Sequence, residues 1–223
     1  MDINSQQPMR LSPRELRPFY RGLYGDTGLL QRFLAVWRPV ICPVAPLAAF
    51  VRPGARVLEI GCGSGALLLS LAKYGRIREA VGCDISELAI RAATDAGKRL
   101  AMPPVEFRIE DFLQAPPGPF DVVLMIDVLH HIPRARQREA LRAAAARVAP
   151  GGRLIYKDMA TRPFWRRWWN TLHDLVLARQ LVNYVPIADA EQWLTEAGLS
   201  LIHAEAYSRL VYGHELRVFQ RLA

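Results

Sequence analysis

Three acidic residues lie at or just beyond the ends of predicted β-strands, where a carboxylate could bind a ligand. Glu59 lies in the apolar run Val57–Ile60, two residues before Gly61. Asp84 follows Gly61 by 23 positions (84 − 61), near the spacing of about 20 typical of an acid that accepts from ribose hydroxyls. Asp111 follows a third predicted strand. Because an acid beside the first turn attracts a cation and repels a pyrophosphate, the pattern favours a nucleoside that carries positive charge.

The glycine-rich turn Gly61–Gly65 joins this strand to the apolar run 66–72, which is predicted to be a helix. Strand, glycine turn and helix are typical of the first βαβ unit of a nucleotide-binding sheet. The glycines let backbone N–H groups approach a ligand, and the start of the helix gives them a favourable dipole. The same turn also satisfies the dinucleotide fingerprint G-x-G-x-x-A. The turn by itself therefore does not distinguish the two kinds of cofactor.

The string Glu59-x-Gly61-x-Gly63-x-Gly65 resembles motif I of the class I S-adenosylmethionine-dependent methyltransferases. Specific motifs carry the resemblance over about residues 50–160. Over the rest of the chain, it depends on the order of the predicted helices and strands. It implies that the cofactor is S-adenosylmethionine, which carries an ammonium and a sulfonium but no phosphate. The cofactor-binding residues that the resemblance implies are Glu59, Gly61, Cys62, Gly63, Asp84, Ile85, Asp111, Phe112, Met125, Ile126 and His131.

Within this set, the pair Asp111-Phe112 follows the predicted strand Val105–Ile109. The resemblance implies that Asp111 accepts a hydrogen bond from the exocyclic amine of the adenine and that Phe112 packs on the ring. The alternative is a loop acid followed by a core phenylalanine.

The stretch Phe120–Ile126 is the most continuous apolar strand of the chain, as expected of a central parallel strand. It closes in the sequence Leu129-His130-His131 and resembles motif IV of small-molecule methyltransferases. The resemblance implies that Met125 and Ile126 lie along the methionine moiety, with His131 beside it.

Residues 162–186 form an insertion after the fifth predicted strand and contain three of the five tryptophans, Trp165, Trp168 and Trp169. One helical face of the insertion is apolar. We consider three interpretations: a lid over an apolar acceptor pocket, a helix packed on the core or at a dimer face, and a basic aromatic helix resting on a membrane surface.

Methyl transfer to a phenol, whose pKa is about 10, is helped by a base or a cation near the hydroxyl. The side chains predicted to fill this catalytic role are His131, His173 and Lys157, with Tyr184 orienting the acceptor and His130 as a further candidate. Each has a structural alternative, because a histidine here often serves the cofactor or the packing and Lys157 can pair with Asp158.

The order of the elements predicts an α/β fold with one Rossmann-like, doubly wound and mostly parallel sheet that ends in an antiparallel hairpin. We expect a helical cap over residues 1–50 and a methyltransferase domain over residues 51–223, with the helical lid at 162–186. Tyr20 and Tyr24 of the cap either face the ligand or pack the cap on the core.

The chain has 223 residues, 51% of them hydrophobic, and a formal net charge of +8. Its cysteines, Cys42, Cys62 and Cys83, show no metal-ligand spacing, so we expect no metal and reduced, buried thiols. The first residues lack the apolar segment of a signal peptide, and no apolar run reaches membrane-spanning length. These features predict a cytoplasmic protein.

The stretch from Tyr156-Lys157-Asp158 to Tyr184-Val185-Pro186 is similar to the small methyltransferases of bacterial aryl-polyene pigment clusters. This similarity implies an aromatic acceptor, with an acyl carrier protein as a partner.

The positive charge supports an RNA methyltransferase as an alternative. Against it, the stretch Ile126-Asp127-Val128-Leu129 lacks the Asn/Asp-Pro-Pro-aromatic string of amino-methylating nucleic-acid enzymes. A nicotinamide-dependent oxidoreductase is the third possibility. It requires the match of Glu59 and of Asp111-Phe112 to the methyltransferase motifs to be a coincidence.

Overall fold

The computed structural model describes residues 12–25, 44–100, 104–160, 183–209 and 212–223. Seven strands form one sheet in the order β3-β2-β1-β4-β5-β7-β6, in which only β7 runs antiparallel to both of its neighbours. The strands are β1 (Ala55–Ile60), β2 (Ile77–Asp84), β3 (Val105–Ile109), β4 (Phe120–Ile126), β5 (Val148–Met159), β6 (Leu199–Arg209) and β7 (Tyr212–Arg221). The carboxyl ends of β1 to β5 therefore meet at one edge of the sheet.

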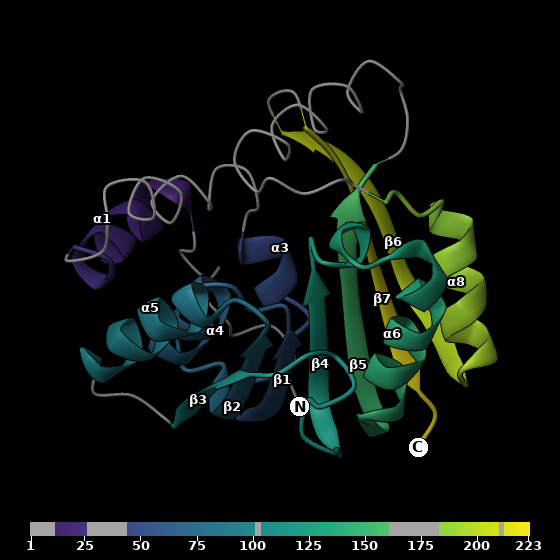
Figure 1. Ribbon diagram of the computed structural model, residues 1–223, viewed down its shortest axis with the longest axis horizontal. Helices are drawn as coiled ribbons and strands as arrows, with labels where there is room; N and C mark the ends of the chain where they lie inside the picture. Colours follow the sequence, from purple (N-terminus) through teal and green to yellow (C-terminus); the bar gives the residue numbers. More distant parts are fainter. Residues whose placement is uncertain (1–11, 26–43, 101–103, 161–182, 210–211) are drawn as a thin grey trace, which may run out of the picture.

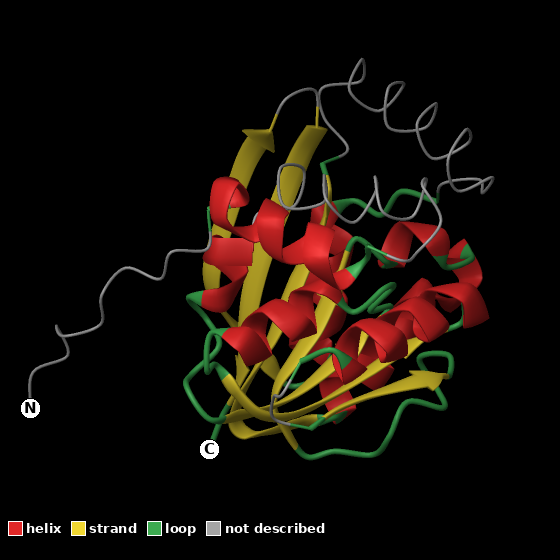
Figure 2. Cartoon of the chain, turned by 90° about the vertical axis from the view of Figure 1, so that its left-hand side faces the viewer, coloured by secondary structure: helices red, strands yellow, loops and turns green. Residues whose placement is uncertain are grey.

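Helices cover both faces of the sheet (Figure 1). They are α1 (Pro13–Leu23), α3 (Val44–Ala48), α4 (Ala66–Lys73), α5 (Glu87–Lys98), α6 (Arg134–Ala146) and α8 (Ile187–Glu196), with the short 3-10 helix η1 (Leu129–His131) after β4. Figure 1 shows α3, α4 and α5 over one half of the sheet and α6 and α8 over the other. Seen from the side, the strands twist strongly behind these helices (Figure 2), as a sheet of L-residues must.

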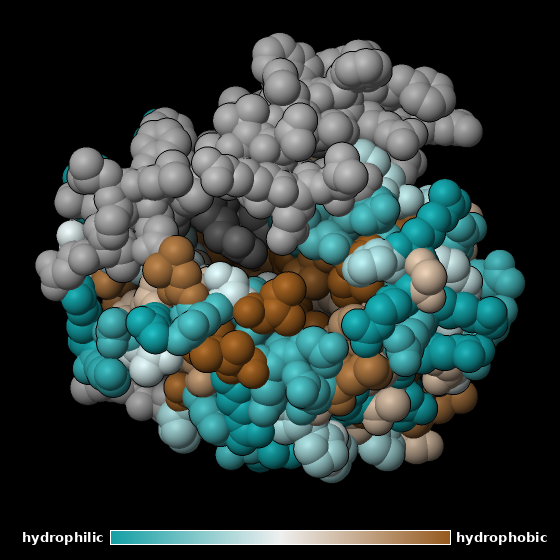
Figure 3. Space-filling model, viewed as in Figure 1, coloured by the Kyte–Doolittle hydropathy of each residue, from teal (hydrophilic) through white to brown (hydrophobic). Residues whose placement is uncertain are grey.

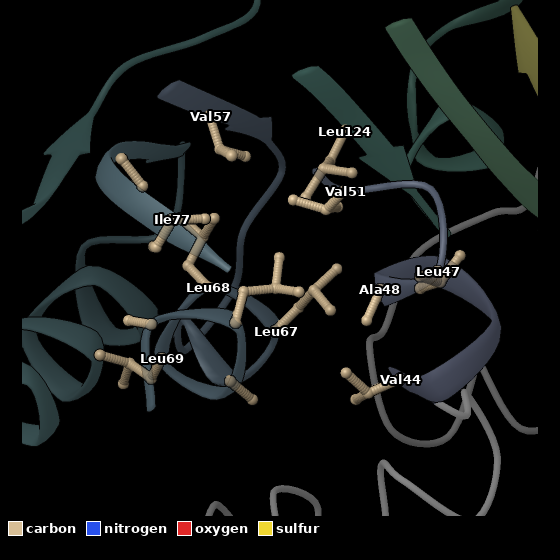
Figure 4. Close-up of a cluster of buried hydrophobic side chains, with 14 of the residues drawn as sticks. Val44, Leu47, Ala48, Val51, Val57, Leu67, Leu68, Leu69, Ile77 and Leu124 are labelled. Carbon is tan, nitrogen blue, oxygen red and sulfur yellow. The ribbon is translucent and has the colours of Figure 1, made fainter. Parts of the chain in front are cut away.

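Two apolar clusters fill the space between the layers. One lies under α3 and α4, where Leu67 points toward Val44 and Ala48 (Figure 4). The other lies under α6 and α8 and includes Met125 and Tyr156. Burial on both faces explains why the central strands are continuous apolar runs rather than alternating ones. The predicted Rossmann-like fold with its closing antiparallel hairpin is confirmed.

The amino-terminal helix α1 packs against the glycine turn and α4. It begins with a capping box, in which the hydroxyl of Ser12 accepts from the backbone N–H of Glu15 and the Glu15 carboxylate accepts from the N–H of Ser12. The hydroxyl of Tyr20 lies 2.7 Å from the Ser70 hydroxyl, and that of Tyr24 donates to the carbonyl of Ser64 at 2.7 Å. Both tyrosines are buried, so they pack the helix on the core, which was one of the two alternatives.

The insertion predicted at 162–186 lies outside the described residues up to position 182, and so do Cys42 and the three tryptophans. Within the described ranges, no helix combines the length and the apolar character needed to cross a membrane.

Candidate active site

The glycine turn between β1 and α4 takes a shape that larger residues do not readily adopt. Gly61, Gly63 and Gly65 have φ values of 73°, 54° and 76°. A Cβ at Gly61 would lie 2.3 Å from the Cγ2 atom of Val128, just beyond β4. The first glycine is therefore required by both the turn and the approach of the β4 loop.

Asp84, at the end of β2, fastens this turn. One carboxylate oxygen accepts from the backbone N–H of Gly63 at 2.8 Å, and the other accepts from the N–H of Ser86 at 2.8 Å. A carboxylate oxygen has more than one lone pair, so each can also accept from a ribose hydroxyl. Cys62 is buried in the turn, and Ile85 follows Asp84 directly with 72% of its surface exposed.

Glu59 is buried near the end of β1, with 1% of its surface exposed. Met125 and Ile126 are buried at the end of the adjacent strand, since Ile60 pairs with Met125. An acid in this position can offset the positive charge of a bound ammonium or sulfonium, while the apolar strand end excludes water.

Asp111 and Phe112 have neighbours that sequence reasoning did not identify. Oδ1 of Asp111 accepts from the backbone N–H groups of Leu113 and Gln114, at 2.8 and 3.1 Å. The Arg136 guanidinium lies 4.6 Å from the ring centre of Phe112 and 3.6 Å from Oδ2 of Asp111. Asp111 thus organises its own turn, and its role toward adenine stays a prediction.

Four large apolar side chains remain exposed beside this turn, at the carboxyl ends of β2 and β3: Ile85, Leu88, Ile109 and Leu113. Figure 3 shows hydrophobic side chains gathered around a hollow at the centre of one face of the molecule. Exposed apolar groups grouped in this way are suited to contact with a flat aromatic base. Together with Asp84 and Glu59, the four side chains fit a nucleoside that has a flat aromatic base, a ribose and a cationic tail.

Lys157 has a structural partner, as its alternative role required, but the partner is Asp127 and not the neighbouring Asp158. Its Nζ lies 2.7 Å from both carboxylate oxygens of Asp127, and the lysine is fully buried. Asp127 is the one non-glycine residue with positive φ in the part of the chain that the structure describes, at 56°. The pairing follows from the parallel register, because Ile126 lies opposite Lys157.

Asp158 points to the opposite face of β5, where its carboxylate accepts a hydrogen bond from Nδ1 of His130. The ring of His130 lies 4.0 Å from that of His131 and 6.5 Å from that of Tyr184, measured between ring centroids. The structure thus brings together three of the residues predicted to act on the acceptor, His130, His131 and Tyr184. His173 lies outside the described residues. Burial, and then the charge of Asp158, hold the pKa of the adjacent Tyr156 well above its usual value, so this phenol stays protonated.

Several residues at the site have no signal in the linear sequence, among them Asp158, Gln137 and Arg136. Each contacts a partner that lies 24 or more positions away in the sequence. Only the strand register and the crossover to α6 bring them to the sheet edge. Among the described residues, no three His, Cys, Asp or Glu side chains gather as metal ligands.

The fold and the sheet-edge site are those of a Rossmann-like methyltransferase. A family model described as a methyltransferase domain matches residues 31–204, so the chain belongs to this family. The predicted membership in the S-adenosylmethionine-dependent methyltransferases, with S-adenosylmethionine as the cofactor, is confirmed. The alternative of a nicotinamide-dependent oxidoreductase is set aside.

Among curated relatives, the ubiquinone biosynthesis O-methyltransferase of Albidiferax ferrireducens is 31% identical over 130 residues, which are 57% of this chain and 47% of that protein. The protein of the same name from Ralstonia nicotianae is 36% identical over 119 residues, which are 52% and 45% of the two chains. The chain thus spans about half the length of the curated relatives it matches.

Among solved structures, the magnesium protoporphyrin IX methyltransferase of Synechocystis PCC 6803 with bound SAH has a TM-score of 0.67 and 25% identity, covering 94% of this chain and 99% of that one. The N-methyltransferase NodS of Bradyrhizobium japonicum WM9 has a TM-score of 0.62 and 21% identity, covering 89% and 99%, and supports the fold alone.

Proposed function

We propose that the protein methylates a small phenolic acceptor, with the cofactor bound across the carboxyl ends of β1 to β3. The observation that carries the acceptor class is the ring cluster of His130, His131 and Tyr184 beside the end of β4. The partly exposed rings of His131 and Tyr184 can stack on an aromatic acceptor and can bond its hydroxyl, and the buried ring of His130 lies behind them. The relatives named for O-methylation in ubiquinone biosynthesis support the same class.

Within this proposal, Glu59, Asp84 and the N–H groups of the glycine turn bind the cofactor, which supplies an electrophilic methyl group on a sulfonium. Phe112 and the exposed apolar side chains at β2 and β3 hold its base. Met125 and Ile126 exclude water from the reacting end.

On the acceptor side, His131 and Tyr184 orient the hydroxyl, and His131 or His173 takes its proton. We do not assign Lys157 direct contact with the acceptor hydroxyl, because its ammonium is bonded to the Asp127 carboxylate. The cap at residues 1–50 and a lid at 162–186, which would close the acceptor pocket, are part of the proposal.

The experiment uses methyl-labelled S-adenosylmethionine and four acceptor classes: simple phenols and catechols, aromatic carboxylic acids, primary amines, and total bacterial RNA. We expect label in a phenol or a catechol, and reduced transfer with His131→Ala. Label in RNA alone would contradict the proposal and favour the nucleic-acid alternative that the net charge of +8 suggested.

A finer proposal concerns the form of the acceptor. The relatives described above give no support to a carrier-bound, aryl-polyene acceptor or to membrane contact through residues 162–186. A free phenol therefore comes first among the acceptors to be tested, and a phenolic acyl carrier protein serves as the comparison.

A further inference from the structure

A buried histidine–carboxylate pair lies directly behind the rings of the proposed acceptor site. Asp158 of β5 accepts three hydrogen bonds: from Nδ1 of His130, from the hydroxyl of Tyr156 at 3.3 Å and from the backbone N–H of Met159 at 2.8 Å. Because a carboxylate only accepts, the imidazole must donate from Nδ1. The carboxylate therefore fixes both the orientation and the tautomer of the His130 ring.

The backbone around His130 is also held from two sides. Its carbonyl accepts from the N–H of Asn183 at 2.8 Å. The buried side-chain amide of Gln137, in α6, donates to the carbonyl of Asn183 at 2.7 Å and lies within 3.2 Å of two further carbonyls at η1. These bonds connect η1 to the segment that carries Tyr184.

The side chain of His130 is itself inaccessible, with 1% of its surface exposed, whereas His131 and Tyr184 are partly exposed. The His130 and His131 rings are tilted by 50°, and the His130 and Tyr184 rings lie within 20° of parallel. A rotation of His130 would therefore displace the contacts of both partly exposed rings.

We propose that His130 and Asp158 are positioning residues for the methyl acceptor. They do not touch it. They hold His131 and Tyr184 in the arrangement that an aromatic acceptor meets, so losing the pair impairs the acceptor and leaves the cofactor bound. This inference rests on the proposed function, since it assigns the pair to the acceptor half of that site.

The test compares Asp158→Ala with Asp158→Asn, because asparagine keeps an oxygen that can accept from Nδ1 of His130. For the phenol that the wild-type enzyme methylates best, we expect Asp158→Ala to lower kcat/KM about 30-fold or more, mainly through KM, and Asp158→Asn to retain most of it. The Kd for S-adenosylhomocysteine should change less than about threefold in both variants. A merely structural role would weaken cofactor binding as well.

The matched control is Glu191→Gln, which breaks the ion pair of Glu191 in α8 with Arg217 in β7 and leaves the hydrogen bonds of Asp158 in place. It should leave kcat/KM unchanged. An unchanged kcat/KM in Asp158→Ala would overturn the proposal, as would equal losses in Asp158→Ala and Glu191→Gln.

Hydrogen exchange at the Asn183 amide gives a readout that needs no acceptor. We expect faster exchange in Asp158→Ala than in the wild type, because the bond to the His130 carbonyl is loosened. Unchanged exchange would overturn the positioning role. A wild-type enzyme that methylates no phenol would instead overturn the proposed function, so the two failures are distinguishable.

Discussion

The two halves of the sheet edge are built from different parts of the chain. At β1 to β3, the shape of the site is set by the backbone: three glycines with positive φ form a turn whose N–H groups Asp84 holds in place. At β4 and β5, it is set by side-chain pairs that join β5 to the residues after β4, Lys157 to Asp127 and Asp158 to His130. The glycine turn depends on positions that carry no side chain. The paired side chains depend instead on both partners being present.

The largest expected effect is in the backbone half. Gly61→Ala should reduce the free energy of unfolding by about 4 kcal/mol, because the strain of a positive φ adds to overlap with Val128. Urea denaturation measures it. The matched control is Gly54→Ala, at a φ of 75° with open space around it, which should show only the strain. Equal losses in the two variants would mean that Val128 does not constrain the turn.

In the paired half, Lys157→Met should reduce the free energy of unfolding by about 3 kcal/mol, because it leaves the Asp127 carboxylate without its bonded ammonium. The double variant Lys157→Met/Asp127→Asn should recover part of this loss, because asparagine removes the carboxylate charge and tolerates the positive φ at this position. Thermal and urea unfolding of the full cycle measure the coupling. Losses that simply add would show that the two side chains do not act as a pair.

Asp84→Ala should weaken S-adenosylhomocysteine binding about 30-fold, close to 2 kcal/mol, because both the ribose acceptor and the bond to the Gly63 N–H are lost. Isothermal titration calorimetry measures the Kd. Glu87→Gln, in the exposed first turn of α5, is the control and should bind normally. Unchanged affinity in Asp84→Ala would remove this residue from the cofactor site.

The smallest effect concerns pH. Burial, and then the charge of Glu110, raise the pKa of Cys83 to about 12, above the value of about 8.5 for a free thiol. The folded protein therefore keeps a proton that the unfolded chain loses, so this stabilisation is complete below pH ~8.5 and declines as the pH rises toward 12. The urea midpoint should fall between pH 8 and pH 10, and fall less in Cys83→Ala. An identical fall in both proteins would contradict the assignment.

The same contrast explains what could be predicted from the sequence. Glu59, Gly61 and Asp84 lie at fixed spacings around one strand–turn–helix unit, so a linear pattern suffices to find them. The bonded pairs of the other half are separated by 30 and 28 positions, and they meet only because β4 and β5 pair in a particular register. The sequence makes Lys157 a candidate and suggests Asp158 as its partner, whereas the register of β4 and β5 gives it Asp127.

The place of β7 in the sheet has a consequence for the order in which the protein forms during synthesis. β7 lies between β5 and β6, and it is β7 that pairs with the strand carrying Lys157 and Asp158. The ribosome releases residues 55–109 before the strands β4 to β7, so β1 to β3 can pair while the rest of the chain is still being made. The outer side of β5 has no neighbour until residues 212–221 emerge. The half of the sheet edge at β1 to β3 can therefore form on the nascent chain, and the half at β4 and β5 is completed only after β7 is released.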